Sequence, residues 1–150
     1  MGIAGYSDLS TYAVTTSDQT QMRNLLGDLF PDLTISSEEE VRTIVTAEPY
    51  SGWYTAQACE VYRTTSEQPL PDSGEMKRQA DEVIQKIPWD EVAFVLEEQN
   101  DTVYHTVCGL QIQQVPINGA QIDLWLDADG LQRLSITGWH GRLENRKRMI

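Results

Sequence analysis

The amino-acid sequence predicts an α+β fold, in which two helices pack on an antiparallel sheet and the C-terminal part of the sheet is a four-stranded meander. Two apolar stripes with a spacing of three to four residues predict the helices, and a proline ends each of them. From residue 91 onward, apolar and polar side chains alternate instead, which is the period of a strand with one buried face.

The first half of the chain, residues 1–66, is predicted to form one helix followed by one hairpin. The helix carries the first apolar stripe and ends at Pro31. This stripe consists of Met22, Leu25, Leu26, Leu29 and Phe30. Residues 40–48 and 53–64 have the composition of strands, and the turn formers between them predict that the two strands pair.

Residues 65–73 contain two prolines and several turn formers, and they predict a linker between the two halves. Asp72 stands three residues before Glu75, which is the pattern of a helix N-cap. The second half, residues 74–140, is predicted to form this helix and the four-stranded meander. We expect a single domain over residues 1–150, whose halves can be two copies of one plan although their residues show no clear repeat.

The meander is divided into strands by its turn signals. Asn100–Asp101 and Asn118–Gly119 are residue pairs typical of tight hairpin turns. The strand of residues 102–114 is expected to bend or bulge, because its apolar residues change phase part of the way along. This interpretation places His105 on the inner face of the sheet, as a core histidine.

The last hairpin is the most strongly patterned segment of the chain. A three-residue loop, residues 128–130, with a glycine in the left-handed region aligns its two strands. The inner-face pairs are then Leu124–Leu134 and Ile122–Ile136, and the outer-face pairs are Trp125–Arg133 and Asp123–Ser135. A shift by one residue would bury Arg133 against the core, so the pattern favours this register. It also predicts a cation–π contact between Arg133 and Trp125.

The acidic residues of this hairpin do not predict a metal site or a catalytic pair. A calcium-binding loop that began at Asp127 would need a glutamate at its twelfth position, which is Gly138. Asp123 and Asp127 would lie about 13 Å apart along a strand, which is too far for an acid–base pair. We therefore expect no metal, no cofactor and no enzymatic activity. The alternative is a small enzyme that uses His140 with a carboxylate such as Glu144.

Composition restricts the class of partner. The net charge of −12 at pH 7 repels nucleic acids and anionic lipids. Such a charge keeps a protein soluble, and the alternative is that it attracts a basic protein partner. No apolar run is long enough to span a bilayer, so we expect no membrane insertion by this segment. Cys59 and Cys108 lack the spacing of a zinc site, and they can be two buried thiols or one disulfide. The sequence does not determine the oligomeric state.

In the second half, the helix EMKRQADEVIQKI is followed by the strand EVAFVLEE and by a meander that contains Gly109-Leu110, Asn118-Gly119, Asp127 to Gly130 and Trp139. This order of elements resembles that of PepSY-like domains and of the extracellular Yyc-type regulators of a cell-wall sensor kinase. The resemblance covers residues 74–140. It implies a non-enzymatic lipoprotein or regulatory domain on the outside of a bacterial cell, with a leader or lipid anchor removed, and it implies no particular functional residue.

We therefore expect a cell-envelope protein that binds a protein partner without catalysing a reaction. Its candidate binding residues are side chains with aromatic or charged groups: Trp125, Arg133, Trp53, Tyr54 and Asp123. The alternative is a cytosolic acidic inhibitor or immunity protein that neutralises a basic toxin or nuclease, and the net charge favours this second class.

Overall fold

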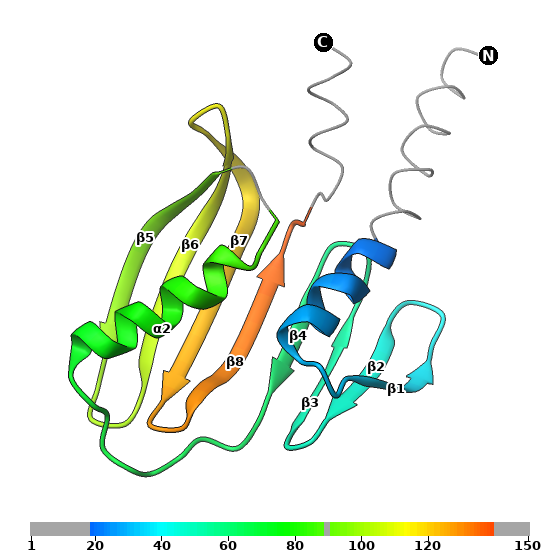
Figure 1. The fold of residues 1–150 in the computed structure, drawn as a ribbon. Helices are drawn as coiled ribbons and strands as arrows, with labels where there is room; N and C mark the ends of the chain where they lie inside the picture. Colours follow the sequence, from blue (N-terminus) through cyan, green and yellow to red (C-terminus); the bar gives the residue numbers. More distant parts are fainter. Residues whose placement is uncertain (1–18, 89–90, 140–150) are drawn as a thin grey trace.

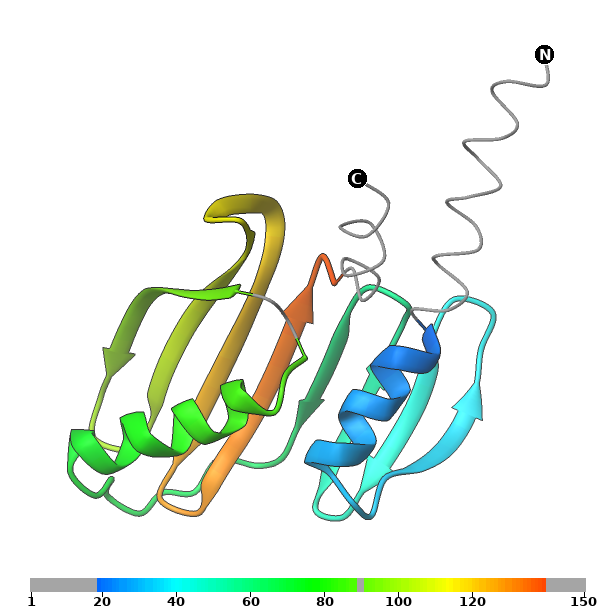
Figure 2. The same cartoon turned by 45° about the horizontal axis from the view of Figure 1, so that its top comes forward.

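The structure, a computed structural model, describes residues 19–88 and 91–139 (Figure 1). It contains one antiparallel sheet of eight strands, and both helices lie on the same face of this sheet (Figure 2). The first helix covers residues 19–29. The other elements are β1 (Thr34–Glu38), β2 (Thr43–Ala47), β3 (Tyr50–Tyr54), β4 (Cys59–Tyr62), α2 (Ser73–Gln85), β5 (Glu91–Gln99), β6 (Tyr104–Ile112), β7 (Val115–Asp127) and β8 (Gly130–Thr137).

The strand order in the sheet is β1-β2-β3-β4-β8-β7-β6-β5. Each half of the chain supplies a helix and then four consecutive strands, and the halves join where β4 pairs with β8. The predicted fold, with an N-terminal hairpin and a C-terminal meander of four strands, is therefore wrong, because all eight strands form one sheet. The strands form one sheet because Val61 of β4 lies opposite Leu134 of β8, and both side chains belong to the same buried layer.

The N-terminal half has four strands where the sequence predicts two. All five residues of β1 are exposed, so this edge strand has no apolar pattern, and a hydrogen bond of 2.7 Å between the hydroxyls of Ser36 and Thr46 joins it to β2. A turn without glycine or proline interrupts the predicted second strand. There the Thr55 hydroxyl accepts hydrogen bonds from the backbone N–H groups of Gln57 and Ala58, at 3.2 and 3.1 Å, which separates β3 from β4.

The core lies between the two helices and one face of the sheet. Its largest fully buried side chains come from both layers, and they include Met22, Leu26, Met76, Ile122, Leu124, Leu134 and Ile136. Burial of one side chain of this size stabilises a fold by about 1.5–3 kcal/mol. Among the described residues, no helix is long and apolar enough to cross a membrane.

Two local predictions for the second half are confirmed. The Asp72 side chain accepts a hydrogen bond of 3.0 Å from the backbone N–H of Glu75, so it caps α2. In the β7–β8 hairpin all four predicted pairs occur, and Gly130 has a φ of +108°. Glycine adopts such a φ without the strain that a side chain would cause. The predicted three-residue loop is wrong, because Asp127 pairs with Gly130 across a two-residue turn, and a register shift between Trp125 and Leu126 restores the predicted pairs.

The predicted phase of β6 is wrong. Its buried residues are Tyr104, Thr106, Cys108 and Leu110. The strand therefore keeps one phase over this stretch, and His105 points to the other face of the sheet. The core accepts two hydroxyl groups here because Tyr104 and Thr106 each find an acceptor on β5. Register shifts lie in β5, between Phe94 and Leu96, and in the pairing of β6 with β7, between Gly109 and Gln111. The irregularity expected in residues 102–114 therefore occurs, but it does not change which side chains face the core.

Cys59 and Cys108 are buried free thiols. They lie in one row across the sheet, because Ile136 on β8 and Ile122 on β7 stand between them. Three strand spacings separate the two cysteines, which amounts to roughly 14 Å. A disulfide needs Cα atoms within about 7 Å of each other. Of the two alternatives that the sequence leaves open, the structure therefore has the free thiols.

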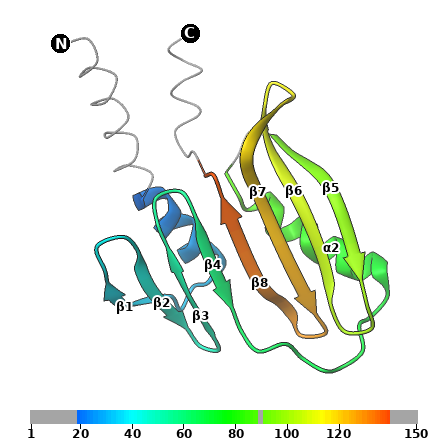
Figure 3. The same ribbon diagram turned by 180° about the vertical axis from the view of Figure 1, so that it is seen from behind.

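We call the face of the sheet that points away from the helices the open face. In Figure 3 the strands stand in front of both helices, and no described element covers them on this side. Along β4 to β8, the open face carries Glu60, Tyr62, Leu96, Glu98, His105, Val107, Asp123, Trp125, Arg133 and Ser135. This face is where the candidate functional site lies.

Candidate functional site

Five side chains form a straight row across the open face, one from each of five neighbouring strands. The row runs from β5 to β4, and its members lie directly opposite each other in the order Glu98, His105, Trp125, Arg133 and Tyr62. We call these five residues the cross-strand row. Directly opposed side chains on adjacent strands have Cβ atoms about 4.5–5.5 Å apart, so each member contacts the next.

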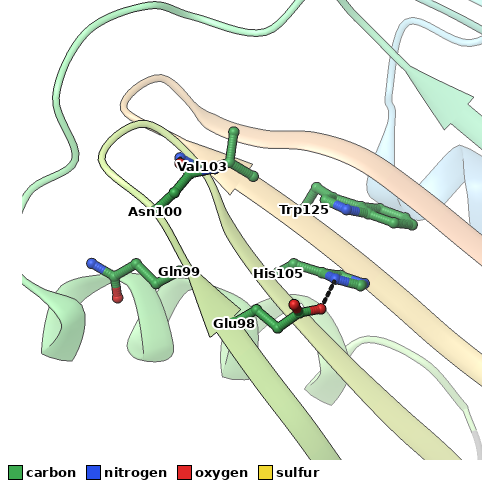
Figure 4. Close-up of a pocket in the computed structure, with 6 residues that line it drawn as sticks. All are labelled: Glu98, Gln99, Asn100, Val103, His105 and Trp125. Carbon is green, nitrogen blue, oxygen red and sulfur yellow. Dashed lines mark hydrogen bonds and ion pairs between the residues drawn. The ribbon is translucent and has the colours of Figure 1, made fainter.

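Trp125 is the centre of the cross-strand row. The His105 ring stacks on its indole ring with centroids 4.3 Å apart and an angle of 4° between the planes (Figure 4). From the strand on the other side, the Arg133 guanidinium lies 5.1 Å from the centroid of the indole, which confirms the predicted cation–π contact. Such a contact stabilises by about 0.5–1 kcal/mol at an exposed site. Trp125 is therefore held in one orientation by both neighbours.

The charges of the site are arranged in pairs. Arg133 forms an ion pair with Glu60 of β4. His105 lies between two carboxylates: its Nδ1 is 3.4 Å from a Glu98 oxygen, and its Nε2 is 3.5 Å from an Asp123 oxygen. Because Arg133 is already balanced by Glu60, the region around His105 keeps an excess of negative charge from Glu98 and Asp123.

A shallow pocket opens at the β5 end of the cross-strand row. Its volume is about 270 Å³, and its lining residues are Glu98, Gln99, Asn100, Val103, His105 and Trp125 (Figure 4). The wall at the β5–β6 turn is well supported, because the Asn100 side chain accepts hydrogen bonds from the backbone N–H groups of Thr102 and Val103, at 2.9 and 2.8 Å. The pocket thus combines two ring edges, one carboxylate and a hydrogen-bonded turn.

An apolar patch lies beside this pocket on the same face. Leu96 of β5 is opposite Val107 of β6, and Leu96 is 41% exposed. Val95 is 57% exposed and lies over Gly109, where an added Cβ would come within 3.5 Å of a Val95 methyl group. Exposed apolar side chains that gather next to polar groups are typical of interaction surfaces.

The structure brings together three of the five predicted binding residues. Trp125, Arg133 and Asp123 lie side by side on β7 and β8. Trp53 is on the same face, but it belongs to β3, where it lies opposite Glu60 of β4. Tyr54 is only 2% exposed and packs in the core, because consecutive residues of a strand point to opposite faces. Tyr54 is therefore not part of the open face.

His105, Glu98 and Tyr62 are members of the site that the sequence pattern does not predict. The placement of His105 and Glu98 on the open face depends on the phase of β6, and the apolar pattern predicts the wrong phase. Tyr62 depends on the pairing of β4 with β8, which joins residues about seventy positions apart in the sequence. A signal that could have indicated this phase is the alternation of Tyr104, Thr106 and Cys108, if hydroxyl groups are accepted in the core.

Asp127, at the end of β7, is not part of the site. Its side chain is fully buried, and it accepts two hydrogen bonds from the Arg63 guanidinium. Burial acts to raise the pKa of Asp127, but the hydrogen bonds from Arg63, Ser66 N–H and Asp129 N–H outweigh it and lower that pKa below the usual value. This carboxylate supports the hairpin that carries Trp125.

Within residues 19–88 and 91–139, no three histidine, cysteine, aspartate or glutamate side chains gather closely enough to hold a metal ion. His140 and Glu144, the pair considered for an enzyme, lie outside the described residues. Comparison of the chain with protein-family models, with curated proteins and with solved structures finds no match. The resemblance to PepSY-like domains therefore stays a prediction.

Proposed function

We propose that this protein is a non-enzymatic binding module whose open face binds a protein partner. The observation that carries the proposal is the cross-strand row, in which Trp125 is stacked between His105 and Arg133 on a sheet face that no described element covers. Tryptophan, tyrosine and arginine are the residue types that most often dominate the binding energy of protein interfaces.

The rigidity of the row supports binding rather than a purely structural role. A side chain that is already ordered loses little conformational entropy when a partner covers it, and this saves about 0.5–1.5 kcal/mol for each such residue. Trp125 is held by the stacked His105 ring and by the cation–π contact with Arg133. Arg133 is held by its ion pair with Glu60. The apolar patch of Val95 and Leu96 supplies surface that gains free energy when it is covered.

We also propose a location in the bacterial envelope, which rests on the resemblance of residues 74–140 to PepSY-like domains and Yyc-type regulators. A second candidate is an acidic inhibitor of a basic toxin or nuclease, and the net charge of −12 supports it. The two differ in salt dependence. An inhibitor that is attracted mainly by charge loses affinity steeply as salt is raised, whereas binding through the apolar patch and the aromatic side chains changes little.

Site-specific photo-crosslinking in the source cells tests the proposal. A benzophenone amino acid replaces Tyr62, which lies at the end of the cross-strand row and is 43% exposed. The matched control replaces Gln85, an exposed residue of α2 on the helix side of the molecule. We expect one protein adduct of defined mass from position 62 and none from position 85. The same adduct from both positions, or none from position 62, would contradict binding at the open face.

A further inference from the structure

We infer that the pocket at the β5 end of the cross-strand row accepts one lysine or arginine side chain of the protein partner. This inference rests on the proposed function, because it names the chemical group that the open face recognises. The pocket is lined by Glu98, His105, Trp125 and the β5–β6 turn. Its charge, its size and the unused hydrogen-bonding capacity of Glu98 suit a cationic side chain.

The charge of the pocket selects a cation. Glu98 lies in its wall, and Asp123 stands directly behind His105 at 3.5 Å from Nε2. Arg133, two positions from His105 along the cross-strand row, is paired with Glu60 and does not offset these two carboxylates. A negatively charged group would meet this local excess as well as the net charge of −12, so an acidic partner is disfavoured.

The size of the pocket suits a single side chain. Its volume of about 270 Å³ is below the range of roughly 300–1,000 Å³ that is usual for small-molecule and cofactor sites. Val103 and the edges of the His105 and Trp125 rings supply apolar contact for the methylene groups of a lysine or arginine, which commonly pack their stems on apolar surface while the charged end stays near water.

Glu98 is able to accept the charged end. Its side chain is 70% exposed, and the contact that it makes with His105 is long, at 3.4 Å (Figure 4). An ionised carboxylate has about four acceptor sites, so the contact with His105 leaves capacity for an ammonium or guanidinium group. Asn100 cannot play this part, because its side-chain oxygen is engaged with the backbone of the turn.

The test uses the full chain and a probe of defined chemistry. Nα-acetyl-arginine amide is titrated into isotope-labelled protein at low salt, and backbone amide shifts are followed by NMR. The neutral isostere Nα-acetyl-citrulline amide is titrated in parallel. We expect saturable shifts centred on residues 98–105 and 125 with the arginine probe, and shifts at least fivefold weaker with the citrulline probe.

Two matched variants identify the carboxylate. Glu98→Gln removes the charge in the pocket, and Glu82→Gln removes a similarly exposed charge on α2, where the side chain is 60% exposed. We expect Glu98→Gln to weaken the arginine probe at least threefold and Glu82→Gln to change its dissociation constant by less than 1.5-fold. Equal effects of the two variants, or shifts spread over the whole acidic surface, would overturn the inference. Thermal unfolding of each variant verifies that it is folded.

The outcomes also separate this inference from the proposed function. If position 62 crosslinks a partner but the arginine probe does not bind beside Glu98, the open face is an interface. The inference that the pocket binds a cationic side chain is then wrong. If the probe binds there but position 62 yields no adduct, the proposed function is wrong and the pocket is not a partner site.

Discussion

Arg63 and Asp127 form a buried ion pair that connects the end of β4 to the β7–β8 hairpin. Two guanidinium nitrogens of Arg63 donate to the two Asp127 oxygens, at 2.8 and 2.7 Å, and the side chains are 9% and 0% exposed. Arg63 also donates to the Gly130 carbonyl at 3.3 Å, and the backbone N–H of Ser66 donates to Asp127 at 2.7 Å. The pair thus holds the linker against the hairpin that carries the candidate site.

Removal of one partner of this pair is expected to destabilise the fold strongly. Asp127→Ala leaves the Arg63 guanidinium buried without a counter-charge, and breaking a buried pair in this way costs about 3–5 kcal/mol. Chemical denaturation measures the free energy of unfolding. The control is Asp129→Asn, an exposed neighbour, for which we expect a change within about 0.5 kcal/mol. A loss below about 1 kcal/mol for Asp127→Ala would show that the pair is not structurally important.

The same pair predicts how stability depends on pH. The pKa of Asp127 is lower in the folded protein than in the unfolded chain, where it is about 3.9. The stabilisation that the ionised Asp127 side chain contributes is therefore fully present above about pH 4. This stabilisation is lost as pH falls through the lowered pKa of the folded state. We expect the difference in unfolding free energy between the wild-type protein and Asp127→Asn to narrow between pH 4 and pH 2. Hydrogen bonds from Arg78 and Gln79 lower the pKa of Glu75 to about 2. This group titrates in both proteins, so its contribution cancels in the difference between them. A constant difference over this range would contradict the assignment.

Both cysteines are expected to resist modification in the folded protein. Burial raises the pKa of Cys59 to about 12 and also raises that of Cys108, so little reactive thiolate forms at pH 8. Mass spectrometry after treatment with iodoacetamide should show no label under native conditions and two labels in denaturant without reductant. If denatured protein takes up no label until it is reduced, the cysteines form a disulfide and the strand order between them is wrong.

A glycine in β3 is expected to be essential for the approach of β4. A Cβ on Gly52 would lie 2.1 Å from the Glu60 carbonyl oxygen and 2.8 Å from the Val61 Cα, and both contacts are with backbone that cannot move aside alone. We expect Gly52→Ala to lower the free energy of unfolding by about 1–3 kcal/mol or more, because overpacking a core usually costs this much. Gly27 is the control, because its Cβ would meet nothing within 4 Å on an exposed helix position. Gly27→Ala should stabilise by about 0.5–1 kcal/mol. Equal stability of the two variants would contradict the β3–β4 pairing.

The extent to which the sequence predicts this structure depends on how far apart the interacting residues are. The β7–β8 register is predictable because a slip of one residue would bury Arg133, and this local penalty is visible in the sequence. The join between β4 and β8 is not predictable in the same way, because alternation in a strand of four residues fits many partners. For the same reason the sequence indicates Trp125 and Arg133 as a pair but does not indicate His105 or Tyr62 beside them.

The central claim is that the open face binds a protein through the cross-strand row. The most direct test is the dissociation constant between the full chain and the protein that crosslinks to position 62, compared across three variants. Trp125→Ala and Arg133→Ala remove side chains of the row, whereas Arg78→Ala removes an ion-paired arginine of similar exposure on α2.

We expect both variants of the row to weaken binding by at least tenfold, which corresponds to about 1.4 kcal/mol, while their thermal unfolding stays cooperative. Arg78→Ala should stay within twofold of the wild-type protein. If Trp125→Ala and Arg133→Ala also stay within twofold, the open face does not bind the partner through this row.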